Sequence, residues 1–600
     1  MLKNVKANLN NSIFKDRLRV DKDYLMSLDL RALLQNYTVE AGVILEGNQI
    51  TPDPSNTYLH WGWESPTCQL RGHFLGHWMS ACAHILAVEK DRQLEARLYE
   101  VIDKLAYYQE LSDDGWVGPI PEKYFYILRH TDRYIWSPQY TMHKLFLGLV
   151  DVYDLLSYKP ALNILSKLSD WYVKWVREND KVCPEATLLG ETGGMLEIWA
   201  RLYMITGQKK YLDLAHAYEK SGILSALDKG EDPLTGNHTN ASIPWAHGTA
   251  AMFIATKDKK YLDLTKKFWK CAVNDREQYA TGGQNAGEFW IPKGKLGEYM
   301  GDRNQEFCTM YNMVRLADYL YKFTGDKEYL DFIEINIYNG FLAQQNPQTG
   351  MPTYFLPMKS ASKKVWGSKT HDFWCCHGTM IQSQTLYSEL AFYEEDESIV
   401  VGQYIPSKLS FGTKGNTVTV SLLADMNSTQ VDSLFEEKGG ERSGSWSFIL
   451  DIEAEKEKEL TIKLRIPGWI KGEPYVLIDK KKRKVTKKEI ESGFVIITGK
   501  FKKNVINIAF EAPLYVLTLP DRKDLGAVME GPKVLASVGE SAVLEDDPEN
   551  CLIPKTERVY QTYPWMYGHY LLPQNGADKE FMPLYEIVDE EYSIYQKIRE

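Results

Sequence analysis

The stretch LYMITGQKKYLDL, residues 202–214, decides the fold because related versions of it occur twice more. MFIATKDKKYLDL spans residues 252–264, and LYKFTGDKEYLDF spans residues 320–332. In each copy, one helix-like apolar run ends at a short polar turn and a second run begins. The first two copies start fifty residues apart, at 202 and 252, which suits a helical hairpin with its loops. Repeats of this length predict stacked helix pairs, arranged as a solenoid or as a closed toroid.

Helical periodicity continues through the first two thirds of the chain. Further helices are predicted at residues 71–89, 93–109, 140–157 and 160–178. We expect about twelve helices before residue 395, a number that suits a closed (α/α)6 barrel. The barrel would occupy residues 1–394, and loops at one end of it would form a pocket.

Short alternating segments replace the helical pattern after residue 395. NTVTVSLLA, SWSFILDIEA, ELTIKLRIPGW, GFVIITGKF and NVINIAFEAPLYVL are separated by turn residues and by lysines. This pattern predicts an antiparallel β-sandwich over residues 395–520. Residues 521–600 would form a second small sandwich or complete the first. The predicted fold class is therefore α + β and multidomain.

Composition excludes several kinds of partner. The chain has 70 basic and 81 acidic residues, a net charge of −11, and no basic tract long enough to follow a phosphate backbone. We therefore expect no nucleic-acid partner. The amino terminus lacks a secretory core and no window is apolar enough to span a bilayer, so no membrane is expected either. Eight cysteines without framework spacing favour a reducing compartment, which we take to be the cytoplasm. A sheet-rich end would suit a homodimer, although no exposed stripe demands one.

A candidate metal site comes from two short motifs. NQEFC contains Glu306 and Cys308, and FWCCHGT contains Cys375 and Cys376. Thiolates and a carboxylate are ligands that Zn²⁺ accepts in a tetrahedral shell. Glu306 and Cys308 would share a face only in an extended segment, and the adjacent cysteines could reach one ion only from a turn, which Gly378 would permit. The alternative is a buried apolar cysteine pair with an unrelated glutamate.

Aromatic residues suggest a pocket for a sugar, whose C–H faces pack on rings while its hydroxyls need polar partners. The clustered aromatic residues are Trp61, Trp63, Trp116, Trp136, Tyr140 and Trp374. His73 and His77 are four residues apart and could suggest a metal, but their apolar neighbours favour packed, hydrogen-bonded histidines.

Longer motifs make the chain similar to the zinc-containing β-L-arabinofuranosidases of glycoside hydrolase family 127 and the related family 146. The motifs that resemble them are WESPTCQLRGHFLGHWMSACA (63–83), WSPQYTMHK (136–144), ETGGMLEIWARLYMITG (191–207), NHTNASIP (237–244), TGGQNAGEFW (281–290), EFCTMYNMVRLADYLY, EINIYNGFLAQQ, FWCCHGT, LRIPGW and GPKVLA. This resemblance implies a retaining exo-glycosidase that acts on a small oligosaccharide or glycoside. Its nucleophile would be a zinc-bound cysteine.

The resemblance also implies roles for individual residues. Glu306, Cys308, Cys375 and Cys376 would bind zinc. Cys375 would be the nucleophile and Glu288 the general acid/base. The residues implied to contact the sugar are His143, Glu334, Tyr354 and either His238 or His247. Thr192 departs from the pattern, because relatives often carry a histidine there, and this change bears on which sugar is bound.

Two other functions fit the same residues. Zinc could act as a Lewis acid on water, which requires an open coordination position. Zinc could instead be a structural staple in a carbohydrate-binding protein, which four filled protein ligands would favour.

Overall fold

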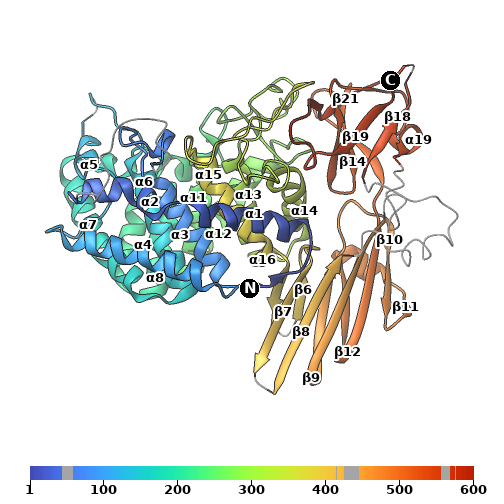
Figure 1. Ribbon diagram of the computed structural model, residues 1–600, viewed down its shortest axis with the longest axis horizontal. Coiled ribbons are helices and arrows are strands. Elements are labelled where there is room, and N and C mark those ends of the chain that lie inside the picture. The colour runs from blue at the N-terminus through green and yellow to red at the C-terminus, as the bar shows by residue number, and fades with distance from the viewer. Residues whose placement is uncertain are drawn as a thin grey trace.

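The computed structural model describes residues 1–43, 59–130, 132–396, 398–413, 415–424, 445–555, 568–574 and 576–599. Helices dominate the chain up to residue 390 and strands dominate from residue 392 onward. In Figure 1 the helical part lies to the left and the strands to the right. Within these ranges, no helix has both the length and the apolar character that crossing a bilayer requires.

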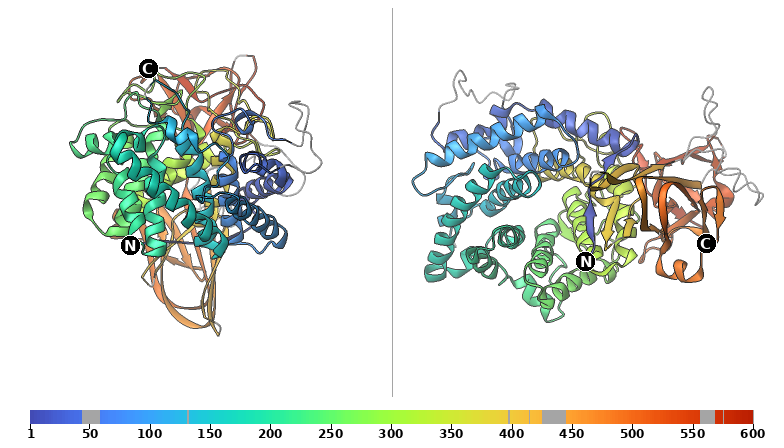
Figure 2. Two further views of the ribbon diagram at one scale, coloured as in Figure 1. Left: turned by 90° about the vertical axis from the view of Figure 1, so that its left-hand side faces the viewer. Right: turned by 90° about the horizontal axis from the view of Figure 1, so that it is seen from below.

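Six helices form a closed inner ring: α3 (His73–Leu86), α6 (Pro138–Leu156), α8 (Gly193–Thr206), α11 (Thr239–Thr256), α13 (Phe307–Thr324) and α15 (Cys375–Ser383). Each packs against the next in this order, and α15 packs back against α3. The helices follow one another around this ring in the right-hand view of Figure 2. Close approach depends on glycine where α3 meets α6: a Cβ on Gly76 would lie 1.9 Å from the carbonyl oxygen of Lys144.

A second layer of helices covers the ring. Each of these five follows a ring helix in the chain and packs on it: α4 (Arg92–Glu110), α7 (Lys159–Val182), α9 (Lys209–Tyr218), α12 (Lys259–Trp269) and α14 (Lys327–Asn336). The remaining helical segments of this part are α1 (Ile13–Ser27), α2 (Leu30–Glu40), η1 (Gly62–Glu64), α5 (Lys123–Ile127), η2 (Pro184–Leu188), α10 (Gly222–Asp228), η3 (Lys270–Asn274), η4 (Ile337–Phe341), η5 (Gln384–Leu386) and α16 (Tyr387–Leu390).

The three related sequence stretches form the same joint in the structure. They connect α8 to α9, α11 to α12 and α13 to α14. Each first helix ends at a residue in the left-handed region: Gly207 (φ 67°), Lys257 (φ 62°) and Gly325 (φ 76°). Glycine adopts this conformation without strain, whereas Lys257 adopts it despite its Cβ. The prediction of repeated helix pairs is confirmed at all three positions.

The strands form two large sheets. The first contains β1 (Lys3–Val5), β2 (Asn8–Leu9), β5 (Phe392–Glu395), β6 (Ser398–Val401), β7 (Ser407–Thr413), β8 (Asn416–Ala424), β9 (Ser445–Arg465), β10 (Lys471–Ile478), β11 (Lys481–Arg483) and β12 (Phe494–Glu511). The second contains β13 (Leu514–Thr518), β14 (Leu525–Glu530), β15 (Lys533–Val538), β16 (Val543–Leu544), β17 (Ile553–Pro554), β18 (Tyr570–Leu572), β19 (Lys579–Pro583), β20 (Tyr592–Ser593) and β21 (Tyr595–Ile598). Short helices α18 (Lys487–Ser492) and α19 (Pro548–Cys551) lie between strands, and β3 (Asn285–Ala286) pairs with β4 (Phe289–Trp290) as a separate hairpin.

Several details differ from the predicted sandwich. Two pairs of strands, β6 with β9 and β16 with β21, are parallel. Four predicted short strands form most of two long ones, β9 with 21 residues and β12 with 18. The charged run 455–459 resembled a turn, but β9 continues through it; the run is largely exposed, and its pairing with β12 shifts register there. Charge alone therefore did not mark a chain reversal.

The amino terminus belongs to the first sheet, although we predicted it to be part of the helical domain. Strand β1 pairs with β5, and β2 pairs with β7. A single hydrophobic core extends through the ring and the first sheet, whereas the second sheet has core clusters of its own. The helical part and the first sheet are therefore packed as one body.

Candidate active site

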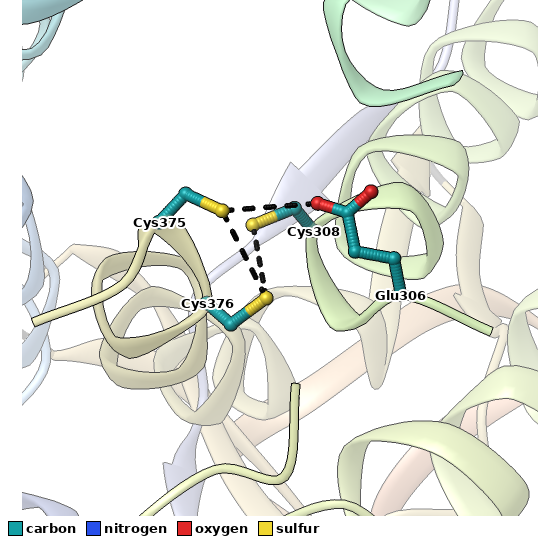
Figure 3. Close-up of side chains that lie close together, drawn as sticks. All are labelled: Glu306, Cys308, Cys375 and Cys376. Carbon is teal, nitrogen blue, oxygen red and sulfur yellow. Dashed lines mark hydrogen bonds between the residues drawn. The ribbon is translucent and has the colours of Figure 1, made fainter. Parts of the chain in front are cut away.

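Three thiols and one carboxylate lie together (Figure 3), where α13 and α15 begin. They belong to Glu306, Cys308, Cys375 and Cys376, which are all buried. Their ligand atoms lie within 4.8 Å of one another. The Cys308 sulfur is 3.5 Å from that of Cys376, and the Cys375 sulfur is 3.7 Å from a Glu306 oxygen. The structure thus brings together all four residues that the two motifs singled out.

Each half of this cluster follows a residue with a left-handed backbone. Gln305 has φ 43° and Phe373 has φ 47°. The Gln305 amide donates hydrogen bonds to the carbonyl of Asn339 and to the side chain of Gln344, both at 3.1 Å. The Phe373 carbonyl lies 2.8 Å from His73 Nε2. These contacts hold the two strained residues in place, so that α13 and α15 begin at the cluster.

The local conformation of the cluster differs from our prediction. Glu306 caps α13 with an extended ψ of 132°, but Cys308 is already in the first turn of that helix. Cys375 and Cys376 open α15 instead of lying in a loop turn. Gly378 serves a different purpose as well, because a Cβ there would lie 2.2 Å from the His77 ring.

The donor set fits a divalent metal ion. Three sulfurs and one carboxylate oxygen form the kind of four-ligand shell that Zn²⁺ prefers. The cluster also lies where α13 and α15 begin, and a helix amino terminus favours negative charge. These residues could therefore hold a metal ion.

The four acidic groups do not ionise equally. Burial raises the pKa of Glu306, Cys308 and Cys376 well above their usual values. By contrast, hydrogen bonds with Cys308 and Cys376 hold the pKa of Cys375 well below its usual value, despite its burial. Cys375 is therefore the sulfur that most readily carries the negative charge, and the thiolate is the nucleophilic form of cysteine.

Glu288 faces this cluster from the β3–β4 hairpin. Its carboxylate accepts a hydrogen bond from the Tyr354 hydroxyl, and that hydroxyl lies 3.6 Å from the Cys375 sulfur. The other carboxylate oxygen of Glu288 is 3.6 Å from His238 Nε2. The Glu288 side chain is one-third exposed, so it lies at the open side of the site. The Tyr354 hydroxyl therefore connects Glu288 to the Cys375 sulfur, and His238 lies on the other side of Glu288.

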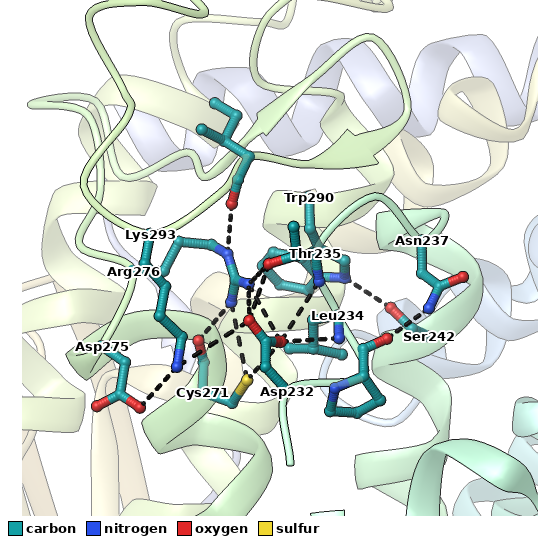
Figure 4. A network of polar contacts seen from close by, with 12 residues as sticks. Asp232, Leu234, Thr235, Asn237, Ser242, Cys271, Asp275, Arg276, Trp290 and Lys293 are labelled. Carbon is teal, nitrogen blue, oxygen red and sulfur yellow. Dashed lines mark hydrogen bonds and ion pairs between the residues drawn. The ribbon is translucent and has the colours of Figure 1, made fainter. Parts of the chain in front are cut away.

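A buried arginine anchors the chain around this hairpin (Figure 4). Arg276 is fully buried and donates hydrogen bonds to the carbonyls of Cys271 and Ile291 and to the side chains of Asp232 and Thr235. Its guanidinium also lies 5.5 Å from the ring centroid of Trp290, the last residue of β4. Sequence reasoning missed this residue, because an isolated arginine in KCAVNDREQ carries no recognisable spacing.

His143 lies in the second turn of α6. It is buried, and its Nε2 has no hydrogen-bond partner among the described residues. The ring packs on Gly194, where a Cβ would lie 2.3 Å from its Cε1. Burial holds the pKa of His143 well below its usual value, so the ring is neutral. A neutral ring with an unused nitrogen can bind a hydroxyl.

Two residues that the resemblance places at the sugar are already bonded within the protein. His247 Nε2 lies 2.8 Å from the Asn312 carbonyl and its Nδ1 lies 3.2 Å from Arg315, so both ring nitrogens are occupied. Glu334 is bonded through one oxygen to Arg465 (2.6 Å) and through the other to the indole of Trp469 (2.7 Å). Both partners of Glu334 belong to the sheet-rich part of the chain. Glu334 therefore joins the two parts. Of the two candidate histidines, His238 contacts Glu288, whereas His247 contacts Asn312 and Arg315.

Several of the clustered aromatic residues contact one another or residues of the site. Trp63 packs on Trp136 with ring centroids 5.1 Å apart, and Tyr140 and Trp63 each contact His73. Trp374 contacts Tyr354 at 5.6 Å. Trp116, in contrast, packs on Trp171 of α7 and belongs to the core. His77 Nδ1 lies 2.6 Å from Gln382, so His73 and His77 are packed histidines, as expected.

The chain is similar to a known family in sequence and to solved structures in fold. The model of the β-L-arabinofuranosidase GH127 catalytic domain matches residues 6–389. A crystal structure of a GH127 β-L-arabinofuranosidase from Geobacillus stearothermophilus T6 is similar, with 15% sequence identity, a TM-score of 0.72, and coverage of 99% of this chain and 100% of that one. A second GH127 β-arabinofuranosidase is similar too, with 15% identity, a TM-score of 0.72, and coverage of 100% of this chain and 98% of that one. At such identity the likeness shows the fold, a helical domain followed by a sheet-rich part. No curated protein matches the chain in sequence.

Proposed function

Because the chain belongs to the GH127 β-L-arabinofuranosidase family and is a glycoside hydrolase, we propose that it releases a terminal β-L-arabinofuranosyl residue with retention of configuration. Cys375 is the nucleophile and Glu288 the general acid/base. One observation carries the proposal: the Tyr354 hydroxyl contacts both the Cys375 sulfur and the Glu288 carboxylate. Nucleophile and acid are thereby held on either side of a single hydroxyl.

The reaction would proceed in two displacements. The Cys375 thiolate attacks the anomeric carbon while Glu288 protonates the departing oxygen. Glu288 then removes a proton from water, which displaces the sulfur and releases the sugar. Two inversions at one carbon restore the original configuration, as in retaining enzymes that use two carboxylates.

A zinc ion would be held by Glu306, Cys308, Cys375 and Cys376. When bound, zinc keeps its thiol ligands ionised at neutral pH. The chain's own residues do the rest: His143, His238 and Tyr354 would orient the sugar, and Tyr354 would keep Glu288 facing the leaving oxygen.

The organisation of the chain supports the same proposal. The closed ring of six helices with helices packed outside it supports an (α/α)6 barrel as the catalytic domain. The two sheets would form the following domains, divided near residue 512. All eight cysteines are free thiols, which supports a reducing compartment such as the cytoplasm.

A purely structural metal in a carbohydrate-binding protein is the main rival, because all four candidate ligands are buried protein groups. Water activated by the metal is less well supported, since it needs an open coordination position.

Cys375→Ser and Cys376→Ser, prepared in parallel, separate these functions. Zinc content is measured together with the turnover of an aryl β-L-arabinofuranoside. We expect Cys375→Ser to lose at least about 10³-fold in kcat while retaining part of the zinc. A haloacetamide or epoxide analogue of the sugar should attach to Cys375 in the wild-type protein. Full activity of the Cys375→Ser variant would show that Cys375 is not the nucleophile.

A further inference from the structure

Two charged residues near Cys375 have no assigned role. Lys144 lies on α6 and is buried, and Glu191 lies two residues before α8. Within the described part of the chain, neither side chain has a hydrogen bond or an ion pair with another residue. A buried charge without a partner is expensive, and such groups are normally paired. Their presence in the site therefore needs an explanation.

A chain of contacts connects the Lys144 ammonium to the start of α15. It lies 4.8 Å from the ring centroid of Tyr140. The Tyr140 ring lies 5.7 Å from the His73 ring, and His73 contacts the carbonyl of Phe373 at 2.8 Å. Phe373 precedes Cys375 by two residues. The ammonium is therefore linked to the start of α15 through Tyr140 and His73.

Electrostatics connects Lys144 to the cluster. Burial lowers the pKa of Lys144 to about 8, while the charges of Cys308, Cys375 and Glu191 act in the opposite direction. These acids are thus near enough for their charge to act on the ammonium. Within the described residues, no hydrogen bond or ion pair joins Lys144 to these acids, so its three N–H groups remain available.

Glu191 lies just before the neighbouring ring helix, α8, which begins at Gly193. The start of α8 is fixed against α6, because Gly194 packs directly on the ring of His143. The charges that act most strongly on Glu191 are those of His238, Cys375, Lys144 and Glu288. Glu191 is therefore within electrostatic range of Lys144 and of the proposed catalytic groups, at the end of α8 that packs on His143.

We propose that Lys144 and Glu191 bind hydroxyl groups of the sugar that reacts with Cys375, and so determine which sugar is accepted. The ammonium offers three donors and the carboxylate offers acceptors, which complement hydroxyls that accept and donate. A sugar seated at Cys375 would give both charged groups the hydrogen-bond partners that they lack within the described part of the chain. This inference rests on the proposed function and adds the groups that recognise the ring.

Substrates that lack single hydroxyls test the proposal. Lys144→Met and Glu191→Gln are compared with wild type on an aryl β-L-arabinofuranoside and on its 2-, 3- and 5-deoxy forms. We expect each variant to lose about 10²-fold in kcat/KM on the parent compound. On the one deoxy form that lacks the hydroxyl bound by the changed residue, variant and wild type should differ by less than about threefold.

Matched controls are Lys159→Met and Glu100→Gln, which change exposed residues of the outer helices and should leave kcat/KM unchanged. Metal content and melting temperature are measured for every variant. An equal loss on all deoxy forms would mean that the residue acts on folding or on the cluster, which overturns the proposal. No loss on the parent compound overturns it as well.

A binding measurement makes the inference testable without turnover. Saturation-transfer NMR is recorded with methyl β-L-arabinofuranoside and with methyl furanosides of other pentoses. We expect wild type to bind at least one of them, and Lys144→Met to bind it at least about tenfold more weakly. If wild type binds a sugar but does not hydrolyse the aryl glycosides, the proposed function fails while this inference stands. If wild type binds none of them, the inference fails.

Discussion

The hydroxyl oxygen of Tyr354 lies 3.6 Å from the sulfur of Cys375. The same hydroxyl donates a hydrogen bond to Glu288. Burial and the charge of Cys375 raise the pKa of Tyr354 far above its usual value, so the phenol keeps its proton. One neutral donor therefore contacts both groups that would do the chemistry.

Tyr354→Phe should reduce kcat by about 10- to 100-fold, because residues that hydrogen bond to metal ligands typically have effects of that size. Zinc content should not change, since the ligands remain. Steady-state kinetics and metal analysis provide the measurement. Tyr107→Phe, at an exposed position on α4, is the control. An unchanged kcat in Tyr354→Phe would show that the phenol has no part in the reaction.

Arg276→Met should destabilise the protein by about 3 kcal/mol, because it leaves the Asp232 carboxylate without its buried partner. It should also lower kcat, since the hairpin that carries Glu288 loses its anchor. Urea unfolding and kinetics measure the two effects. Lys293→Met, at the half-exposed rim of the same network, should change both by much less. Equal effects in the two variants would contradict the anchoring role.

Glu334→Gln should lower the melting temperature without changing KM, because Glu334 bonds to Arg465 and Trp469 and not to the sugar. Breaking a buried ion pair of this kind typically costs about 3–5 kcal/mol. Calorimetry and kinetics on the aryl glycoside distinguish the two roles. If the Glu334→Gln variant had normal stability but a raised KM, the result would support the contact between Glu334 and the sugar that the resemblance implied.

His84→Gln should make stability depend less on pH above neutrality. Glu389, 2.6 Å from His84 Nδ1, helps to raise the pKa of His84 from 6.5 to about 9, against the effect of burial. A raised folded-state pKa adds stability that is complete below pH 6.5 and is lost as the pH rises through 9. The contribution is at most about 3 kcal/mol. Urea midpoints of wild type and variant at pH 6 and pH 9.5 measure it, and a constant difference would contradict the prediction.

Metal removal should destabilise the native protein, because four buried groups would lose a shared ligand. The protein as purified should contain about one zinc per chain, and Cys308→Ser should contain much less. Dialysis against a chelator should lower the melting temperature and expose thiols to a maleimide. Wild-type protein that contains no zinc and resists chelation would disprove a metal site.

Much of the fold could be predicted from the sequence because its signals are local. The joint 202–214 and its two relatives contain apolar periodicity and a turn within thirteen residues, and all three fold alike. Strands β9 and β12 were divided wrongly because their charged residues are tolerated on exposed faces as long as the ladder continues. The place of β1 in the first sheet depends on a pairing distant in sequence, which no local pattern reveals.

The residues of the site likewise include some that the sequence predicted and others that it did not. The four cluster residues could be identified from their chemistry, because three of only eight cysteines and a nearby glutamate occur in two short motifs. The resemblance suggested Glu334 and His247, but it could not tell that each was already bonded within this protein. Arg276, Lys144 and Glu191 were missed because only the folded chain brings them to the site.

The pairing of Lys3 with Glu394 has a consequence for biosynthesis. The ribosome must add about 390 further residues before the first strand finds its neighbour, and the helical ring likewise stays open until α15 has emerged. Throughout most of translation, β1 therefore lacks its partner strand and the hydrophobic core of the helical ring is incomplete. Exposed strands and apolar surfaces of this kind are prone to misassembly. We therefore expect the yield of folded protein to depend on chaperones during expression.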